Sequence, residues 1–146
     1  MAAGAWEVYD KFPLYLGDGT IALDTDAVVF ALFLSTSNAG TLTNDNLADL
    51  TNEVSGNGYA RDTTNTVTYT ESAGVVTYDV TTDPVYTASG GSIVARRAVL
   101  FDDTPASPAD PLICTCLLDA TPADVTVVDG NTLTIQIAAA GIFTIS

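Results

Sequence analysis

The sequence contains no histidine, and only four of its 146 residues are basic. Histidine is the commonest general base and the commonest metal ligand in proteins, so its absence removes the Ser-His and Cys-His pairs of nucleophilic catalysis. Lysine occurs once, at Lys11, and the other basic residues are Arg61, Arg96 and Arg97. We therefore expect no enzyme, no catalytic residues, no metal ligands and no bound cofactor.

The scarcity of positive charge leaves the chain strongly acidic. Eighteen acidic residues against four basic ones give a formal net charge of −14. Phosphate backbones and anionic membrane surfaces repel such a chain, so we expect neither nucleic acid nor a membrane as its partner. A well-solvated surface explains the acidity most simply, and docking onto a basic partner or tolerance of high salt are the functional alternatives.

Long apolar runs and a leader sequence are missing as well. The longest apolar stretch, Ala27 to Leu34, is too short to cross a bilayer as a helix. The N-terminus, "MAAGAWEVYDKFPLYLG", has neither the basic start nor the continuous apolar core of a signal peptide. We expect a protein that is made in the cytoplasm, is soluble there, and can still end in an external particle released by lysis.

Cysteine is limited to Cys114 and Cys116, two positions apart in a stretch that favours a strand. Both side chains then point to the same side, where two cysteines of one strand are badly placed to bond each other. Two buried free thiols are one interpretation, because an unpaired cysteine behaves as a small hydrophobic residue. A disulfide between chains is the other.

What the sequence has is the composition of one β-rich domain. Hydrophobic residues make up 47% and charged residues 15% of the chain, with many Thr, Val, Ala and Asp. No linker or repeat divides it, so we predict a single domain over residues 1–146, with residues 1–16 as an N-terminal arm. The arm carries Trp6, Tyr9, Phe12 and Tyr15, and Pro13 limits any helix before it. These aromatic rings either close one end of the core or anchor a neighbouring subunit.

Alternating and apolar stretches predict the strands. The run from Asp26 to Ser35 is apolar at both alternating sets of positions, which predicts a strand buried on both faces. Further strands are expected at 65–70 and 75–80, joined as a hairpin, and at 93–103, 112–119, 124–128 and from 131 to the C-terminus, with Asp129-Gly130 as a tight turn. A short helix is expected in "TLTNDNLADL", capped by Thr43 or Asn44. Together these predict a mainly β fold, an antiparallel sandwich of about eight strands with one short helix, for which a jelly-roll arrangement is one form.

Motifs that carry chemistry are weak or absent. Acid pairs occur at Asp24 and Asp26, at Asp102 and Asp103, and at Asp45 and Asp49, but nothing in the sequence places them across a cleft as a glycosidase requires. No stretch has the ligand spacing of a calcium-binding loop, although a calcium ion bound at the surface remains an alternative. The glycine-rich "SGNG" and "SGGS" match no phosphate-binding pattern and indicate turns.

The arginines are the most informative polar residues. Arg96 and Arg97 interrupt an apolar strand and, being consecutive, point to opposite faces. Either they lie in an edge strand in water, or one of them pairs with carboxylates of this chain or of a neighbour. In "NEVSGNGYAR", Asn57-Gly58 favours a left-handed corner between helix and strand. We expect Arg61, beside Tyr59, to lock this corner to a carboxylate within or between subunits.

Five segments, "LDTDAVVFALF", "DLTNEVSGNGYAR", "RAVLFDDT", "PLICTCLLD" and "GNTLTIQIAAAGIFTIS", resemble in order and spacing a family of small virion proteins of tailed bacteriophages. The resemblance covers nearly the whole chain after Leu14, and "NEVSGNGYAR" is its most specific part. The cysteine pair and the scarcity of lysine depart from the family pattern. The resemblance implies a structural, non-enzymatic component of the virion.

A decoration or cement protein on the capsid exterior is the first expectation from this resemblance, and a tail or fibre component is the second. The expected partners are the major capsid protein and further copies of the chain, with a trimer favoured. Expected interface residues are Trp6, Tyr9 and Phe12 as apolar anchors and Arg61, Arg96 and Arg97 as charge partners. The alternatives are an adhesin that binds host-surface glycan through Tyr59, Tyr69 and Tyr78, and, last, an enzyme on envelope polysaccharide that uses Asp102 or Asp103.

Overall fold

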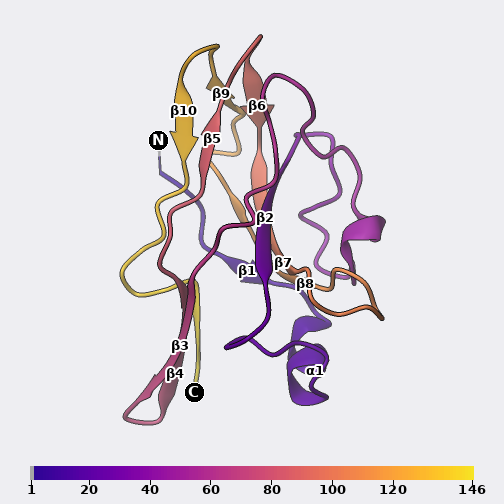
Figure 1. Cartoon of the computed structure of the whole chain (residues 1–146), viewed down its shortest axis with the longest axis vertical. Coiled ribbons are helices and arrows are strands. Elements are labelled where there is room, and N and C mark those ends of the chain that lie inside the picture. The colour runs from indigo at the N-terminus through magenta and orange to yellow at the C-terminus, as the bar shows by residue number, and fades with distance from the viewer. Residues whose placement is uncertain (1) are drawn as a thin grey trace.

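A computed structural model describes residues 2–146 and is mainly antiparallel β (Figure 1). The mainly β class and its compatibility with a sandwich are confirmed, but the chain forms eleven strands where about eight were predicted. The strands are β1 Glu7–Val8, β2 Val28–Phe33, β3 Val67–Ser72, β4 Val75–Val80, β5 Val85–Thr87, β6 Ile93–Ala95, β7 Arg97–Asp102, β8 Leu112–Leu117, β9 Val125–Val127, β10 Thr132–Thr134 and β11 Phe143–Ile145. The extra strands arise because two predicted strands are each broken in two, and because β1 and β5 are too short to give a sequence pattern.

A four-stranded sheet with the order β1-β8-β7-β2 forms the centre of the fold. All six residues of β2 are buried, as its doubly apolar sequence predicts. Phe30 and Leu32 face one side, where the smaller sheets cover them, and Val29 and Phe33 face the other. That second side is closed by Tyr9 and by the loop that contains Leu42, Leu47 and Leu50. The core therefore lies on both faces of the central sheet.

The remaining strands form three smaller sheets, with the strand orders β11-β4-β3, β10-β5 and β6-β9. In Figure 1 the β3–β4 hairpin points to one end of the molecule, while β5, β6, β9 and β10 gather at the other. The predicted hairpin is confirmed, and its two strands turn through Ala73 and Gly74, which have φ angles of 53° and 81°. Both angles lie in the left-handed region that suits the twist of a two-residue hairpin turn.

The predicted single strand from residue 93 to 103 is wrong, because the chain changes sheets at Arg96. β6 pairs with β9, whereas β7 pairs with β2 and β8. Between them, the backbone N–H of Arg96 donates to the carbonyl of Phe33 at 2.8 Å, and the N–H of Leu118 donates to the carbonyl of Arg96 at 2.9 Å. One continuous apolar stretch thus contributes strands to two sheets. The two strands meet at Arg96, whose backbone N–H and carbonyl are both hydrogen-bonded.

Asp129-Gly130 does form a tight turn, in which the N–H of Asn131 donates to the carbonyl of Val128 at 3.0 Å. The strands on either side of this turn do not pair with each other. β9 pairs with β6, and β10 pairs with β5, so the turn passes the chain between two sheets. The stretch after it is also divided, into β10 and the C-terminal β11.

The helices differ in part from the expectation. The helix expected near residues 43–50 is a single 3₁₀ turn, Leu47–Asp49, and its cap is Asn46 rather than Thr43 or Asn44. Asn46 accepts a hydrogen bond from the N–H of Ala48, and Asp49 accepts one from the N–H of Asn46, which closes a capping box. The α-helix proper is α1, Phe12–Gly17, which has Pro13 in its first turn, where a proline is well tolerated. No helix within residues 2–146 is long and apolar enough to cross a membrane.

Two glycines with nearly equal φ angles allow a test of how tightly the chain packs against β4 in the three-stranded sheet. Gly130 and Gly141 have φ angles of 81° and 82°. A Cβ atom at Gly141 would lie 2.7 Å from the carbonyl oxygen of Tyr78, whereas one at Gly130 would meet nothing within 4 Å. We expect Gly130→Ala to lower the free energy of unfolding by about 1 kcal/mol from backbone strain alone. Gly141→Ala should lower it by about 3 kcal/mol, since overpacking adds to the strain.

Urea unfolding followed by circular dichroism measures both variants. Equal losses for Gly130→Ala and Gly141→Ala would contradict the close contact between Gly141 and β4.

Candidate functional site

The stretch from Asn52 to Asp62 covers the edge of β2 that β7 leaves open. The N–H of Val54 donates to the carbonyl of Leu32 at 2.9 Å, and Phe30 and Asp62 exchange two backbone hydrogen bonds of 3.0 Å. Between these points the chain departs from the strand and makes the corner predicted at Asn57-Gly58. We call residues 52–62 the β2 corner. Its first task is to satisfy the backbone of a buried strand.

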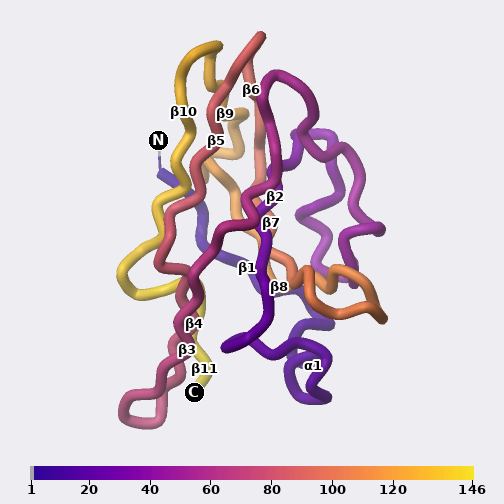
Figure 2. The backbone as a smooth tube through the Cα atoms, in the orientation of Figure 1, coloured from indigo at the N-terminus to yellow at the C-terminus, as the bar shows by residue number. Residues whose placement is uncertain are grey.

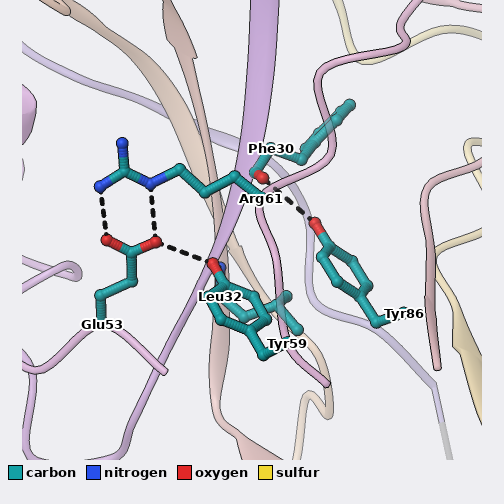
Figure 3. Close-up of polar contacts among 6 residues, drawn as sticks. All are labelled: Phe30, Leu32, Glu53, Tyr59, Arg61 and Tyr86. Carbon is teal, nitrogen blue, oxygen red and sulfur yellow. Dashed lines mark hydrogen bonds and ion pairs between the residues drawn. The ribbon is translucent and has the colours of Figure 1, made fainter. Parts of the chain in front are cut away.

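Tyr59 bridges the gap where the β2 corner leaves the strand (Figure 3). Its hydroxyl oxygen accepts a hydrogen bond from the backbone N–H of Leu32 at 2.9 Å, and the same hydroxyl donates to Oε1 of Glu53 at 2.9 Å. A side-chain hydroxyl thus replaces the backbone acceptor that a neighbouring strand would supply. Burial raises the pKa of Tyr59 well above its ordinary value, and the nearby Glu53 carboxylate acts in the same direction. The hydroxyl therefore stays protonated and remains a donor.

Arg61 holds Glu53 in place through two parallel hydrogen bonds. Its Nε donates to Oε1 at 2.8 Å and its Nη2 donates to Oε2 at 2.7 Å, a fork-to-fork pair (Figure 3). The guanidinium carbon also lies 5.6 Å from the centre of the Phe101 ring. The expectation that Arg61 locks the corner to a carboxylate is confirmed, and the carboxylate belongs to the same chain. Glu53 was not singled out from the sequence, although it is the one acidic residue between Asp49 and Asp62.

A second tyrosine and two left-handed residues complete the β2 corner. The Tyr86 ring stacks on the Tyr59 ring with 5.8 Å between centroids, and its hydroxyl donates to the carbonyl of Phe30 at 3.3 Å. Asn57 and Gly58 have φ angles of 54° and 80°, as predicted for the turn. A Cβ atom at Gly58 would lie 2.8 Å from the carbonyl oxygen of Thr87, so only glycine fits against β5 here. The corner is a packing and hydrogen-bonding device, and it has no phosphate-binding geometry.

The other three basic side chains also pair within the chain. Arg96 Nε lies 2.8 Å from Asp124, Arg97 Nη1 lies 3.2 Å from Glu7, and Lys11 Nζ lies 2.8 Å from Asp45. Of the two alternatives for the arginine pair, the structure has ion pairs with acids of this chain. Since all four basic side chains are engaged internally, the surface of the chain offers carboxylates to a partner and no free basic side chain.

The aromatic residues of the N-terminal segment face the interior. Trp6 is half-buried with its ring 5.9 Å from that of Phe30, and Tyr9 is 1% exposed with its hydroxyl donating to the carbonyl of Ala39. Phe12 is 3% exposed and meets the ring of Phe143 edge-on at 5.3 Å. In the single chain these rings close one end of the core. Their part in an interface stays a prediction.

An apolar groove opens beside these rings, between α1 and β11. Its lining residues carry no charge: Val8, Phe12, Pro13, Leu16, Gly17, Phe143, Thr144 and Ile145. Figure 2 shows α1 and the C-terminus at the same end of the molecule. Leu14 on the helix is 58% exposed and Ile145 on β11 is 37% exposed, so apolar side chains stand in water at this end. No local pattern in the sequence marks these two residues, because only the fold brings α1 to β11.

The residues proposed for the other function classes differ in exposure, and two of the five, Tyr78 and Asp102, are fully buried. Of the three candidate glycan-binding tyrosines, Tyr69 is 38% exposed, Tyr78 is fully buried, and Tyr59 uses its hydroxyl in the β2 corner. Asp102, the candidate catalytic acid, is fully buried, while Asp103 is exposed. Within residues 2–146 no three acidic or cysteine side chains are grouped so that they could hold a metal ion.

The two cysteines are free and buried in β8. Burial raises the pKa of Cys116 to about 12 and that of Cys114 in the same direction, so neither thiol ionises near neutral pH. The interpretation as buried hydrophobic side chains fits this position, and a disulfide to a second chain would need the strand to leave the core.

Comparisons with models of known protein families, with curated proteins and with solved structures found no match to this chain.

Tyr59→Phe tests the role of the β2 corner. Loss of the hydroxyl leaves the buried N–H of Leu32 without its acceptor and removes one donor to Glu53, so we expect the free energy of unfolding to fall by about 1–3 kcal/mol. Tyr69→Phe, the same change at an exposed ring, should alter it by less than about 0.5 kcal/mol. Urea unfolding measures both. A Tyr59→Phe variant as stable as the parent would show that the hydroxyl is not needed to close β2.

Proposed function

We propose that this protein is a structural component of a tailed-phage virion. In this proposal it binds the capsid exterior as a decoration or cement protein and acts without catalysis. The resemblance of five segments to such virion proteins supports the proposal. Within the structure, the supporting observation is the uncharged apolar groove between α1 and β11, because it offers an adhesive surface on an otherwise acidic chain.

The charge distribution narrows the kind of partner. The net charge is −14, and the four basic side chains are taken up by Asp45, Glu53, Asp124 and Glu7. Two copies in contact would bring acidic surfaces together, unless the contact runs through an uncharged region such as the groove. A capsid surface with basic residues around an apolar patch would complement both features. The proposed homo-oligomer, with a trimer favoured, would then form where several capsid subunits hold the copies together.

The alternative role as a tail or fibre module that binds glycan has less support from the surface. Sugar rings stack on exposed aromatic faces, and of the three candidate tyrosines Tyr69 is exposed, Tyr59 is half-buried and Tyr78 is buried. We therefore place the capsid role first.

Leu14→Asp tests the groove region as the docking surface. Leu14 does not line the groove but directly follows the lining residue Pro13 in α1. Because Leu14 is 58% exposed, the change should leave folding intact while placing a charge next to the groove. We expect it to weaken binding to capsids stripped of this protein by at least roughly tenfold, as loss of an interface anchor does. Co-sedimentation with such capsids measures the binding, and light scattering gives the number of copies per complex.

Val128→Asp is the matched control, since Val128 is 56% exposed but lies in neither α1 nor β11. It should bind as the parent does. Equal weakening by both variants would count against the groove, and no binding of the parent to stripped capsids would overturn the capsid role itself.

A further inference from the structure

One buried oxygen atom of the central sheet has no hydrogen-bond partner and belongs to a carboxyl group. Asp102 ends β7 with its side chain fully buried, at the position opposite Val28 of β2. Its Oδ1 accepts a hydrogen bond from the N–H of Thr104 at 2.9 Å, while its Oδ2 has no donor. A buried carboxylate with a bare oxygen costs considerable free energy, so a charged Asp102 would be poorly accommodated here.

A second carboxyl group lies within hydrogen-bonding reach of the first. Asp26 precedes β2, and one of its oxygens accepts from the N–H of Ala22 at 2.7 Å. Asp26 lies two residues before Val28, the residue opposite Asp102, so the register makes the two side chains diagonal neighbours on one face of the sheet, and the Asp26 carboxyl group acts to raise the pKa of Asp102. Two ionised carboxylates are acceptors only and repel each other, whereas a single proton between them supplies the missing donor.

We propose that Asp26 and Asp102 share one proton in the folded protein, with Asp102 as the protonated member, and that the fold loses stability as the pH rises towards neutrality. The proposal is independent of the capsid role, because it concerns the chain alone.

No side chain within residues 2–146 donates a hydrogen bond to the bare oxygen. The hydroxyl of Tyr78 on β4 is the nearby donor, but it is also buried without a hydrogen-bond partner. At the outer edge of β2, Asp62 accepts from Thr64. Beyond Asp102 in sequence, Asp103 and Asp110 contact each other. All four basic side chains are paired with other carboxylates, Arg61 among them with Glu53.

The direction of the effect follows from the pKa of Asp102, which burial raises first and the Asp26 carboxylate raises further, to about 7 from an ordinary 3.8. Between these two values the folded state binds a proton that the unfolded state has released. Stability is therefore greatest below the unfolded pKa, falls as the pH rises towards about 7, and levels off above it. Where one proton is fully linked, the unfolding constant rises roughly tenfold per pH unit.

The absence of histidine makes this titration unusually easy to isolate. With no imidazole in the chain, no side chain of ordinary pKa changes charge between about pH 5.5 and 8. The α-amino group titrates in this range, but it is the same in the parent and in every variant. A pH dependence that one substitution removes can then be assigned to the substituted group.

Two measurements test the proposal. Infrared spectroscopy of the parent at pH 5.5 and 8 should show a protonated carboxyl band at the lower pH that is lost at the higher one, and this needs no variant. Urea unfolding over the same range should show the unfolding constant of the parent rising by at least roughly tenfold. Asp102→Asn keeps the shape and supplies a permanent donor to Asp26, so its unfolding constant should be nearly independent of pH.

Asp24→Asn is the matched control, because Asp24 is an exposed carboxylate two residues from Asp26. It removes the same charge and should keep the pH dependence of the parent. If Asp102→Asn does not fold, Asp26→Asn takes its place and should reduce the pH dependence, since it removes the like charge.

Three results would overturn the shared proton. The first is an infrared spectrum without a protonated carboxyl group at pH 5.5. The second is an equal pH dependence in the parent and Asp102→Asn. The third is stabilisation of the parent at pH 8 by millimolar CaCl₂ that is absent in Asp102→Asn, because the pair would then hold a cation in place of the proton.

Discussion

The fold depends on satisfying both edges of β2. This strand is buried on both faces, so its backbone groups have no access to water and must all find partners inside the protein. β7 supplies them on one edge. Within residues 2–146 no full strand covers the other edge. There the β2 corner supplies the hydrogen-bond partners, through scattered backbone contacts and the hydroxyl group of Tyr59. The Glu53–Arg61 pair then fixes that hydroxyl, which explains why an ion pair stands so close to the core.

The few basic residues also connect parts of the fold. Each basic side chain pairs two segments that are distant in sequence, except for Arg61, which closes its own corner. Arg97 ties β7 to β1, and Lys11 ties the start of α1 to the loop at Asp45. Exposed pairs of this kind add little stability individually, but they set which segments lie together. The surface charge that is not taken up in these pairs is almost entirely negative.

Sequence patterns identified the elements whose partners are close in the chain or whose burial is complete. The alternation of Val67 and Tyr69 against threonines predicted the β3–β4 hairpin, and the doubly apolar run predicted β2. The break at Arg96 escaped, because it depends on backbone contacts with Phe33 and Leu118, which no local pattern contains. The cap at Asn46 was not predicted for a simpler reason. Thr43 and Asn44, the two caps expected from the sequence, lie only two or three residues before it and have equally suitable side chains.

The candidate site was predictable to a similar degree. The need of Arg61 for a carboxylate followed from the charge balance, but the identity of Glu53 required the register of the corner on β2. The burial of Asp102 could not be foreseen, because an Asp-Asp pair at a strand end is usually solvated. The groove between α1 and β11 was equally hidden, since it joins residues near opposite ends of the chain.

That groove has a mechanical consequence. Its walls come from β1 and α1 on one side and from β11 on the other, segments that are far apart in sequence. A molecule that binds to a surface stabilises the segments that form it. An occupant of this groove would therefore hold β11 against α1, so separating the two would cost more free energy with the groove filled than with it empty.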